Sequence, residues 1–194
     1  MGEPFEILVV CLGNVCRSPL AERVLRMRLE ELGADSSVVR VSSAGARALV
    51  GHPMDEHAAA ELRRLGGDPD GFAATQLTGA AASGADLVLA ATRELRSRVL
   101  EEAPRALRRT FTIRELAGLL ATDPDPAATA DGATALVARA AARRGAGVGA
   151  EYDGTDPFGR PQEVHRQVAD VLDRDCTTIA RAFAAALRAE APAD

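Results

Sequence analysis

The segment from Val10 to Pro19, with the sequence VCLGNVCRSP, constrains the fold of this chain more than any other. A short apolar, β-branched run at Glu6–Val10 precedes it, and residues 18–32 follow it with apolar side chains at a helical period. The order is therefore strand, tight loop, helix. Gly13 and Asn14 supply the backbone freedom that a tight loop at such a junction needs.

Strand and helix candidates alternate along the rest of the chain. The sequence predicts strands at Val38–Ser42, Asp86–Ala91 and Thr110–Ile113, and helices at Met54–Leu65, Arg93–Ala103, Arg114–Leu120 and Pro161–Leu187. This alternation indicates βαβ units, and hence an α/β fold with a mainly parallel sheet covered by helices on both faces. We expect one domain over residues 1–194, because a single core usually serves roughly 100–200 residues.

Residues 122–149 differ from the rest in composition, since Ala, Gly, Asp and Pro dominate there. We interpret this segment as an insertion that contains a helix at residues 133–144. Residues 188–194 are interpreted as a frayed tail.

Bulk properties exclude several classes of protein. A formal net charge of −5 argues against nucleic-acid binding, and no run approaches the roughly 20 apolar residues of a membrane span. Three cysteines and a start without a basic, apolar leader predict a reducing, cytoplasmic location. His52, His57 and His165 share no metal-ligand spacing, so we predict neither a metal nor a cofactor.

The loop carries the groups that a phosphate site needs. Backbone N–H groups at a helix N-terminus favour an anion, and the planar guanidinium of Arg17 can bind two phosphate oxygens at once. The same field stabilises a thiolate, so Cys11 should be nucleophilic, and Ser18 lies where its hydroxyl can donate to that sulfur. The predicted phosphate-binding loop around Cys11 comprises Leu12, Gly13, Asn14, Val15, Cys16, Arg17 and Ser18.

Cysteine attack on a phosphomonoester also needs an acid that protonates the leaving oxygen. Asp156 is the candidate, because Pro157 fixes the backbone after it and the surrounding turn is rich in glycine. Phe158 places a ring where it can stack beside an aromatic substrate. Asp153 is the alternative acid.

The string from Cys11 to Pro19 resembles the signature of low-molecular-weight protein tyrosine phosphatases, which runs Cys, any residue, Gly, Asn, Ile or Val, Cys, Arg, Ser, Pro. The resemblance implies that Cys11 forms a phosphocysteine intermediate and that Arg17 binds the phosphoryl group. It implies that Asn14 and Ser18 order the loop. It further implies a compact doubly wound sheet of about four parallel strands.

The resemblance extends beyond the loop. Asp156 would be the family acid and later the base that activates water, and Ser43 resembles the family serine that binds the loop asparagine. Ala48–Gly51 is similar to bacterial members associated with capsule and exopolysaccharide tyrosine kinases. The expected pocket walls are Leu12, Ala48, Leu49 and Phe158. Where many relatives show His-x-Ala-Arg-Gln, the segment Phe72–Thr78 lacks the histidine and the arginine.

The predicted function is hydrolysis of phosphotyrosine in a protein, for example in a bacterial tyrosine kinase. A small-molecule phosphatase acting on a phosphorylated metabolite by the same mechanism is the alternative, because Phe72–Thr78 departs from the family near the site. Arsenate reductase is less favoured, since it needs two further thiols and Ala80–Thr92 contains no cysteine. A reversible disulfide between Cys11 and Cys16 stays open as a protective device.

Overall fold

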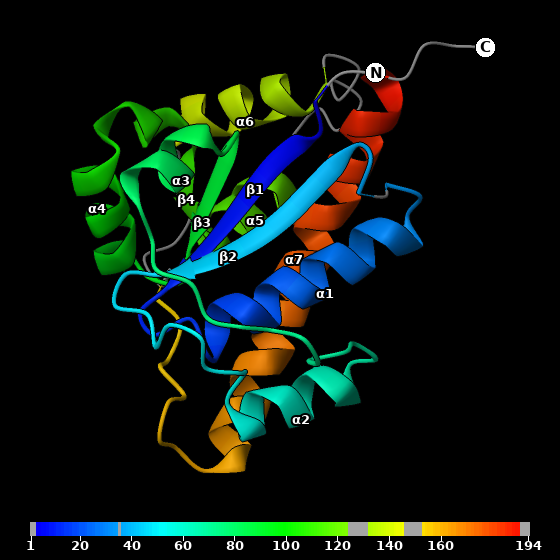
Figure 1. Ribbon diagram of the computed structural model, residues 1–194. Coiled ribbons are helices and arrows are strands. Elements are labelled where there is room, and N and C mark those ends of the chain that lie inside the picture. Colours follow the sequence, from blue (N-terminus) through cyan, green and yellow to red (C-terminus); the bar gives the residue numbers. More distant parts are fainter. Residues whose placement is uncertain (1–2, 35, 124–131, 146–152, 191–194) are drawn as a thin grey trace.

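The computed structural model describes residues 3–34, 36–123, 132–145 and 153–190. Four strands in these ranges form one parallel sheet in the order β2-β1-β3-β4 (Figure 1). This confirms the predicted fold class. The strands are β1 (Phe5–Cys11), β2 (Val39–Gly45), β3 (Leu87–Ala90) and β4 (Thr110–Thr112).

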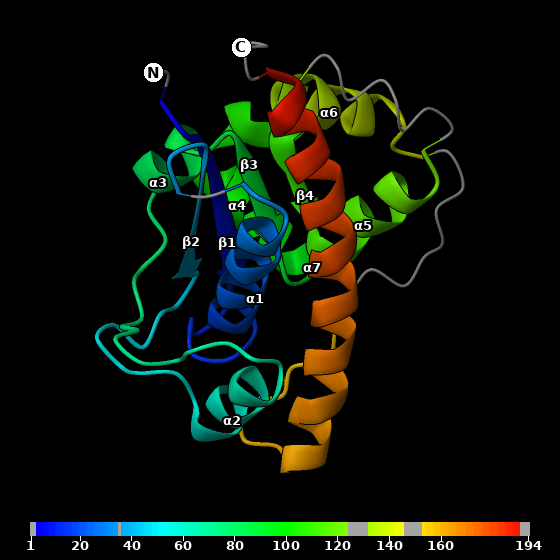
Figure 2. The ribbon, with the colours of Figure 1, turned by 90° about the vertical axis from the view of Figure 1, so that its right-hand side faces the viewer.

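Helices cover both faces of the sheet, with α1, α5 and α7 on one side and α3 and α4 on the other (Figure 2). Successive side chains of β1 point to opposite faces of the sheet. Ile7 and Val9 pack in the core cluster with α1, α5 and α7, and Leu8 and Val10 pack in the core cluster with α3 and α4. The helices are α1 (Arg17–Glu31), α2 (Glu56–Arg64), α3 (Gly79–Gly84), α4 (Arg93–Glu102), the 3₁₀ helix η1 (Pro104–Arg109), α5 (Ile113–Ala121), α6 (Gly132–Ala142) and α7 (Gln162–Glu190).

Among the boundaries that differ from the sequence expectation, those of β2 and α2 have identifiable causes. β2 runs three residues beyond the predicted Ser42, because its last residues pair with the end of β1. α2 begins at Glu56 rather than Met54, since the Asp55 side chain accepts hydrogen bonds from the N–H groups of His57 and Ala58 and so caps the helix. The short α3 was not predicted, because six residues of sequence GAAASG carry no apolar period.

The predicted insertion holds a helix, α6, that is anchored to the sheet edge. The guanidinium of Arg144, just beyond α6, lies 3.9 Å from the ring centroid of Phe111 on β4 and 3.1 Å from a carboxylate oxygen of Glu115 on α5. Leu136 and Val137 of α6 belong to the main core cluster. The remainder of the predicted insertion, residues 124–131 and 146–149, lies outside the described residues.

α7 is 29 residues long and reaches Glu190, three residues past the predicted end at Leu187. Arg188, in the segment predicted to fray, donates a hydrogen bond to the carbonyl of Leu32 at 2.6 Å. Residues 191–194 lie outside the described part of the chain. None of the helices in the described ranges combines the length and the apolar character that crossing a bilayer requires.

The carboxyl ends of the central strands meet at one edge of the sheet, where Cys11 pairs with Gly45 and Val10 with Ala90. Ligands of open parallel sheets bind at this edge. A Cβ on Gly45 would lie 2.7 Å from the carbonyl oxygen of Leu12, so only glycine lets the end of β2 approach the loop this closely. The fold therefore places the loop after β1 at the functional edge.

Candidate active site

Cys11 ends β1 and faces donors from its own loop. The N–H of Asn14 lies 3.2 Å from its Sγ, and the Ser18 hydroxyl donates to Sγ at 2.9 Å. α1 begins at Arg17, and within the described chain its N-terminal amides have no side-chain cap and its first turn has no acidic residue. Amides of this kind attract an anion. The loop therefore directs hydrogen-bond donors at the sulfur of Cys11, beside uncapped amides of α1.

Asn14 holds the loop in shape. Its φ of 56° lies in the left-handed region, which asparagine tolerates better than most residues. Its side-chain N–H₂ group donates to Ser18 Oγ at 2.8 Å and to Ser43 Oγ at 2.9 Å. Its side-chain oxygen Oδ1 accepts a hydrogen bond from the N–H of Thr75 at 2.7 Å. Thr75 belongs to the segment that lacks the family histidine and arginine. The backbone of that segment nevertheless contacts the loop.

Glu22 extends this network and was not among the predicted site residues. Its side chain is buried, accepts from the Ser43 hydroxyl at 2.6 Å and pairs with Arg26 at 2.7 Å. Glu22 follows Ser18 by four residues, so both lie on the same face of α1. This spacing from Ser18 was the feature of the sequence that could have identified Glu22 as a neighbour of the loop. A buried carboxylate on the loop-facing side of α1 requires partners such as these.

Asn14→Ala should destabilise the protein and slow turnover. The change removes three side-chain hydrogen bonds and places a Cβ-bearing residue without a compensating side chain at φ 56°. We expect the free energy of unfolding to fall by about 4 kcal/mol. Asn14→Gly, the matched variant, should recover about 1 kcal/mol of that loss but no turnover. Urea unfolding measures the free energy of unfolding, and hydrolysis of p-nitrophenyl phosphate measures turnover. Wild-type turnover in the glycine variant would contradict the role assigned to the side-chain amide of Asn14.

Arg17 and Asp156 meet over the loop. Arg17 Nη2 lies 2.6 Å from Asp156 Oδ2, and their side chains are 6% and 47% exposed. Arg17 Nε is buried and has no hydrogen-bond partner within the described chain, which leaves it as a donor for a phosphate oxygen. The predicted acid is thus held beside the predicted phosphate-binding guanidinium.

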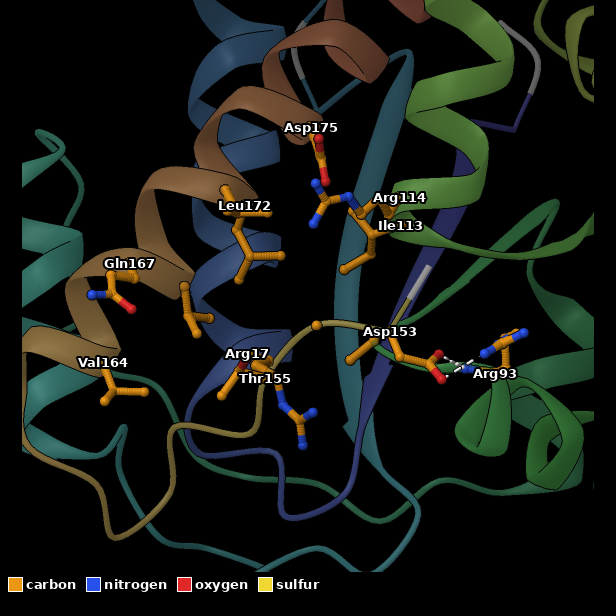
Figure 3. Close-up of a pocket in the computed structure, with 14 residues that line it drawn as sticks. Arg17, Arg93, Ile113, Arg114, Asp153, Thr155, Val164, Gln167, Leu172 and Asp175 are labelled. Atoms are coloured by element: carbon orange, nitrogen blue, oxygen red, sulfur yellow. Dashed lines mark hydrogen bonds and ion pairs between the residues drawn. The ribbon is translucent and has the colours of Figure 1, made fainter. Parts of the chain in front are cut away.

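Asp153, the alternative acid, is used differently. It accepts from the backbone N–H of Arg93 at 2.6 Å and from Arg93 Nε at 3.3 Å, at the start of α4 (Figure 3). It does not line the cavity that contains Cys11. This geometry favours Asp156 over Asp153 as the acid.

The cavity around Cys11 has a volume of about 180 Å³. Exposed apolar side chains of Leu12, Leu49 and Phe158 surround it, as the sequence suggested, but Ala48 is not among its lining residues. The Ala48 N–H donates to Gln76 at 3.0 Å, and Arg47 lines the cavity instead. The complete lining is Cys11, Leu12, Gly13, Val15, Cys16, Arg17, Arg47, Leu49, Asp156 and Phe158.

A larger cavity of about 510 Å³ lies on the other side of Arg17, between the turn at residues 153–155 and α7. Figure 3 shows Asp175 of α7 directed toward Arg114 of α5 at its far end. Burial raises the pKa of the Asp175 carboxyl, and Arg114 partly opposes this effect. Cys11 does not line this cavity, whereas it does line the smaller one.

Cys16 is unsuited to act as the nucleophile. Burial, and then the charge of Asp55, raise the pKa of its thiol well above the ordinary value. All three cysteines, Cys11, Cys16 and Cys176, are free thiols in this structure. Cys11 is the thiol that receives the hydrogen bonds of the loop.

Residues 6–130 match the family described as low molecular weight phosphotyrosine protein phosphatase. The chain belongs to this family. The low-molecular-weight protein-tyrosine-phosphatase Etp of Escherichia coli K12 is 42% identical over 105 residues, which cover 54% of this chain and 66% of Etp, just under two thirds. The resemblance read from the residues Cys11 to Pro19 is therefore confirmed.

Two further members of the family match over most of their length. A protein-arginine-phosphatase of Geobacillus stearothermophilus is 29% identical over 170 residues, which cover 88% of this chain and 90% of that protein. The structure of Vibrio vulnificus Wzb in complex with benzylphosphonate superposes with a TM-score of 0.66 at 25% identity, covering 93% of this chain and 99% of Wzb. The names of these relatives therefore differ in the residue that is dephosphorylated, tyrosine for Etp and arginine for the Geobacillus protein.

Proposed function

We propose that this protein is a cysteine-dependent, metal-independent protein tyrosine phosphatase. One observation carries the proposal: Cys11, Arg17 and Asp156 line the same small cavity, with an apolar rim around its mouth. We further propose that residues 1–194 act as a single phosphatase domain, with the helix α6 of the insertion outside the cavity that contains Cys11.

The proposed reaction has two steps. The Cys11 thiolate attacks phosphorus and forms an S–P bond, while the bond to the tyrosine oxygen breaks and the Asp156 carboxyl gives that oxygen its proton. Water then attacks phosphorus, Asp156 takes the proton, and the S–P bond breaks to release inorganic phosphate. The loop amides and Arg17 stabilise the charge on the phosphoryl oxygens in both steps.

Arg17 links substrate binding to the acid. In the structure its Nη2 contacts Asp156 at 2.6 Å. A phosphate dianion between the loop amides and Arg17 would compete for this guanidinium and leave Asp156 next to the leaving oxygen. Binding of the phosphate and release of the acid are therefore expected to occur together.

Phosphotyrosine is the favoured substrate because of the size and the lining of the cavity. About 180 Å³ is below the roughly 300–1,000 Å³ of sites that enclose drug-sized ligands, so a single phosphorylated side chain fits better than a whole nucleotide. Leu12, Leu49 and Phe158 offer apolar contact to a phenyl ring. The complex of the related Wzb with benzylphosphonate supports an aromatic occupant.

The partner we propose is a phosphotyrosine protein, such as a bacterial tyrosine kinase. The active site needs Cys11 as a free thiol, which supports a reducing, cytoplasmic location. A phosphorylated metabolite remains the second candidate from the sequence. It is disfavoured by the small cavity, and favoured only by the substituted segment Phe72–Thr78.

Phosphoarginine is a further candidate, because the matched Geobacillus protein is named a protein-arginine-phosphatase and aligns over most of both chains. The guanidinium of phosphoarginine is polar and bears N–H donors that require hydrogen-bond acceptors. The cavity offers one carboxylate, Asp156, and it carries a second cation, Arg47, at its wall. Apolar Val15 also lines the cavity. These residues support an aryl phosphate over phosphoarginine.

A substrate panel tests the proposal. Phosphotyrosine peptides should be hydrolysed with a kcat/KM at least about 100-fold above phosphoserine peptides, phosphoarginine peptides and sugar or nucleotide phosphates, which corresponds to about 3 kcal/mol of differential transition-state binding. The release of inorganic phosphate is measured for every substrate, so that the kcat/KM values can be compared directly. A higher kcat/KM on phosphoarginine or on a metabolite would overturn the substrate assignment while leaving the cysteine mechanism intact.

A further inference from the structure

Three potential metal ligands far apart in sequence meet beneath the catalytic loop. Sγ of Cys16, a carboxylate oxygen of Asp55 and a ring nitrogen of His165 all lie within 4.8 Å of one another. Cys16 precedes α1, Asp55 caps α2, and His165 lies in the first turn of α7. Their spacing in the sequence gave no sign of a site, because tertiary packing alone brings them together.

His165 is a buried member of this cluster, and one of its ring nitrogens is left unsatisfied. The residue is 2% exposed, and its Nε2 is buried with no hydrogen-bond partner within the described chain. Its Nδ1 is 3.7 Å from Asp55 Oδ1, which is too long for a hydrogen bond. The ring also lies 5.2 Å, centroid to centroid, from that of His57. A buried ring nitrogen without a partner is costly, and an ion is one of the common explanations for such an atom.

We propose that Cys16, Asp55 and His165 form a binding site for Zn²⁺, with a fourth position left to water. Thiolate, imidazole and carboxylate are the ligands that zinc takes in proteins. Zn–S of about 2.3 Å and Zn–N of about 2.0 Å place neighbouring ligand atoms roughly 3.5 Å apart, so side-chain movements of about 1 Å complete the site. The separation of 3.7 Å between Asp55 Oδ1 and His165 Nδ1 suits two ligands of one ion, with Nδ1 as the ligating nitrogen.

Binding would exchange a proton for the metal without any redox change. Zn²⁺ displaces the proton of the Cys16 thiol, an S–Zn bond forms, and the proton leaves to solvent. The two anionic ligands, Cys16 thiolate and Asp55, then balance the charge of the ion. The bound ion would join the loop to α2 and α7, because one ligand comes from each.

Metal titration of chelator-treated, tag-free protein tests the site. The Cys11→Ser variant serves as the background, so that the nucleophile itself contributes no thiolate. We expect one Zn²⁺ per chain by isothermal titration calorimetry, and a rise in Tm of about 5 °C at a free Zn²⁺ concentration 100 times the Kd. Co²⁺ in place of Zn²⁺ should give a thiolate-to-metal charge-transfer band.

Variants of the ligands decide whether the ion binds here. His165→Gln and Asp55→Asn, each added to the Cys11→Ser background, should weaken Zn²⁺ binding by about 100-fold, and Cys16→Ser should also abolish the charge-transfer band. Asparagine keeps the cap of α2 in the second variant. The matched control, His52→Gln, changes an exposed histidine outside the cluster and should bind Zn²⁺ unchanged.

Two outcomes would overturn the proposal. One is Zn²⁺ affinity in the His165→Gln variant equal to that of its background, provided that circular dichroism shows both to be folded. The other is the absence of any Zn²⁺ binding at micromolar concentration in the Cys11→Ser protein. Neither outcome depends on the phosphatase activity proposed above.

Discussion

Replacing Cys11 with serine will abolish hydrolysis of p-nitrophenyl phosphate, with kcat reduced by at least about 10⁴-fold. The loop amide of Asn14 and the Ser18 hydroxyl stabilise a thiolate at this position, whereas a serine hydroxyl keeps its proton near neutral pH. Arg17 and the backbone amides stay in place. Steady-state assays at saturating substrate provide the measurement.

Two controls make the Cys11 result specific. Cys176→Ala changes a buried thiol of α7 outside the cavity and should leave kcat unchanged. The Cys11→Ser protein itself should still bind inorganic phosphate, because the serine variant keeps the anion site. Turnover retained in Cys11→Ser would refute the phosphocysteine mechanism.

Asp156→Asn should lower kcat for phosphotyrosine peptides by about 10²–10³-fold, because asparagine cannot give the leaving oxygen a proton. The loss should be smaller with p-nitrophenyl phosphate, since p-nitrophenolate leaves well without protonation. Asparagine preserves the shape of the side chain beside Arg17, so the KM should change far less than kcat. The ratio of the two losses is the most specific signature of a general acid.

Asp153→Asn is the matched control for the acid. Asp153 binds the N–H and the guanidinium of Arg93 at the start of α4, and an asparagine carbonyl can still accept from both. Its kcat should remain within about threefold of wild type, a change below about 0.7 kcal/mol. A large, leaving-group-dependent loss in this variant, with Asp156→Asn unaffected, would transfer the acid role to Asp153.

The pattern of the sequence predicted the elements with strong local signals. The strand, loop and helix around Cys11 were placed correctly, because a β-branched run and an apolar helical period are both local properties. The six residues of α3 were missed, since they carry no period, and their helix depends on the Thr78 cap and on packing against α4. The last three residues of β2 were missed because their pairing with β1 is a long-range contact.

The residues of the candidate site also divide into those that the sequence predicted and those that it did not. Cys11, Arg17 and Ser18 lie within one short segment, so their relation to a bound anion follows from the chain itself. Arg47 at the cavity wall was not predicted, because nothing local distinguishes it from a surface charge. Glu22 behind the loop was not predicted either, since its spacing of four residues from Ser18 was its one local signal. Their roles depend on which elements fold against the loop.

What the sequence by itself determined is the chemistry of one loop: a cysteine, a helix N-terminus and an arginine in ten consecutive residues, with the fold that such a loop requires. The tertiary structure decided which aspartate lies beside that loop, since Asp156 contacts Arg17 and Asp153 contacts Arg93. It also decided how the loop is supported without the family histidine, through Thr75 and Glu22. The physical reason is that hydrogen bonds and ion pairs act over a few ångströms, and only the packed sheet and helices bring residues distant in sequence within that range.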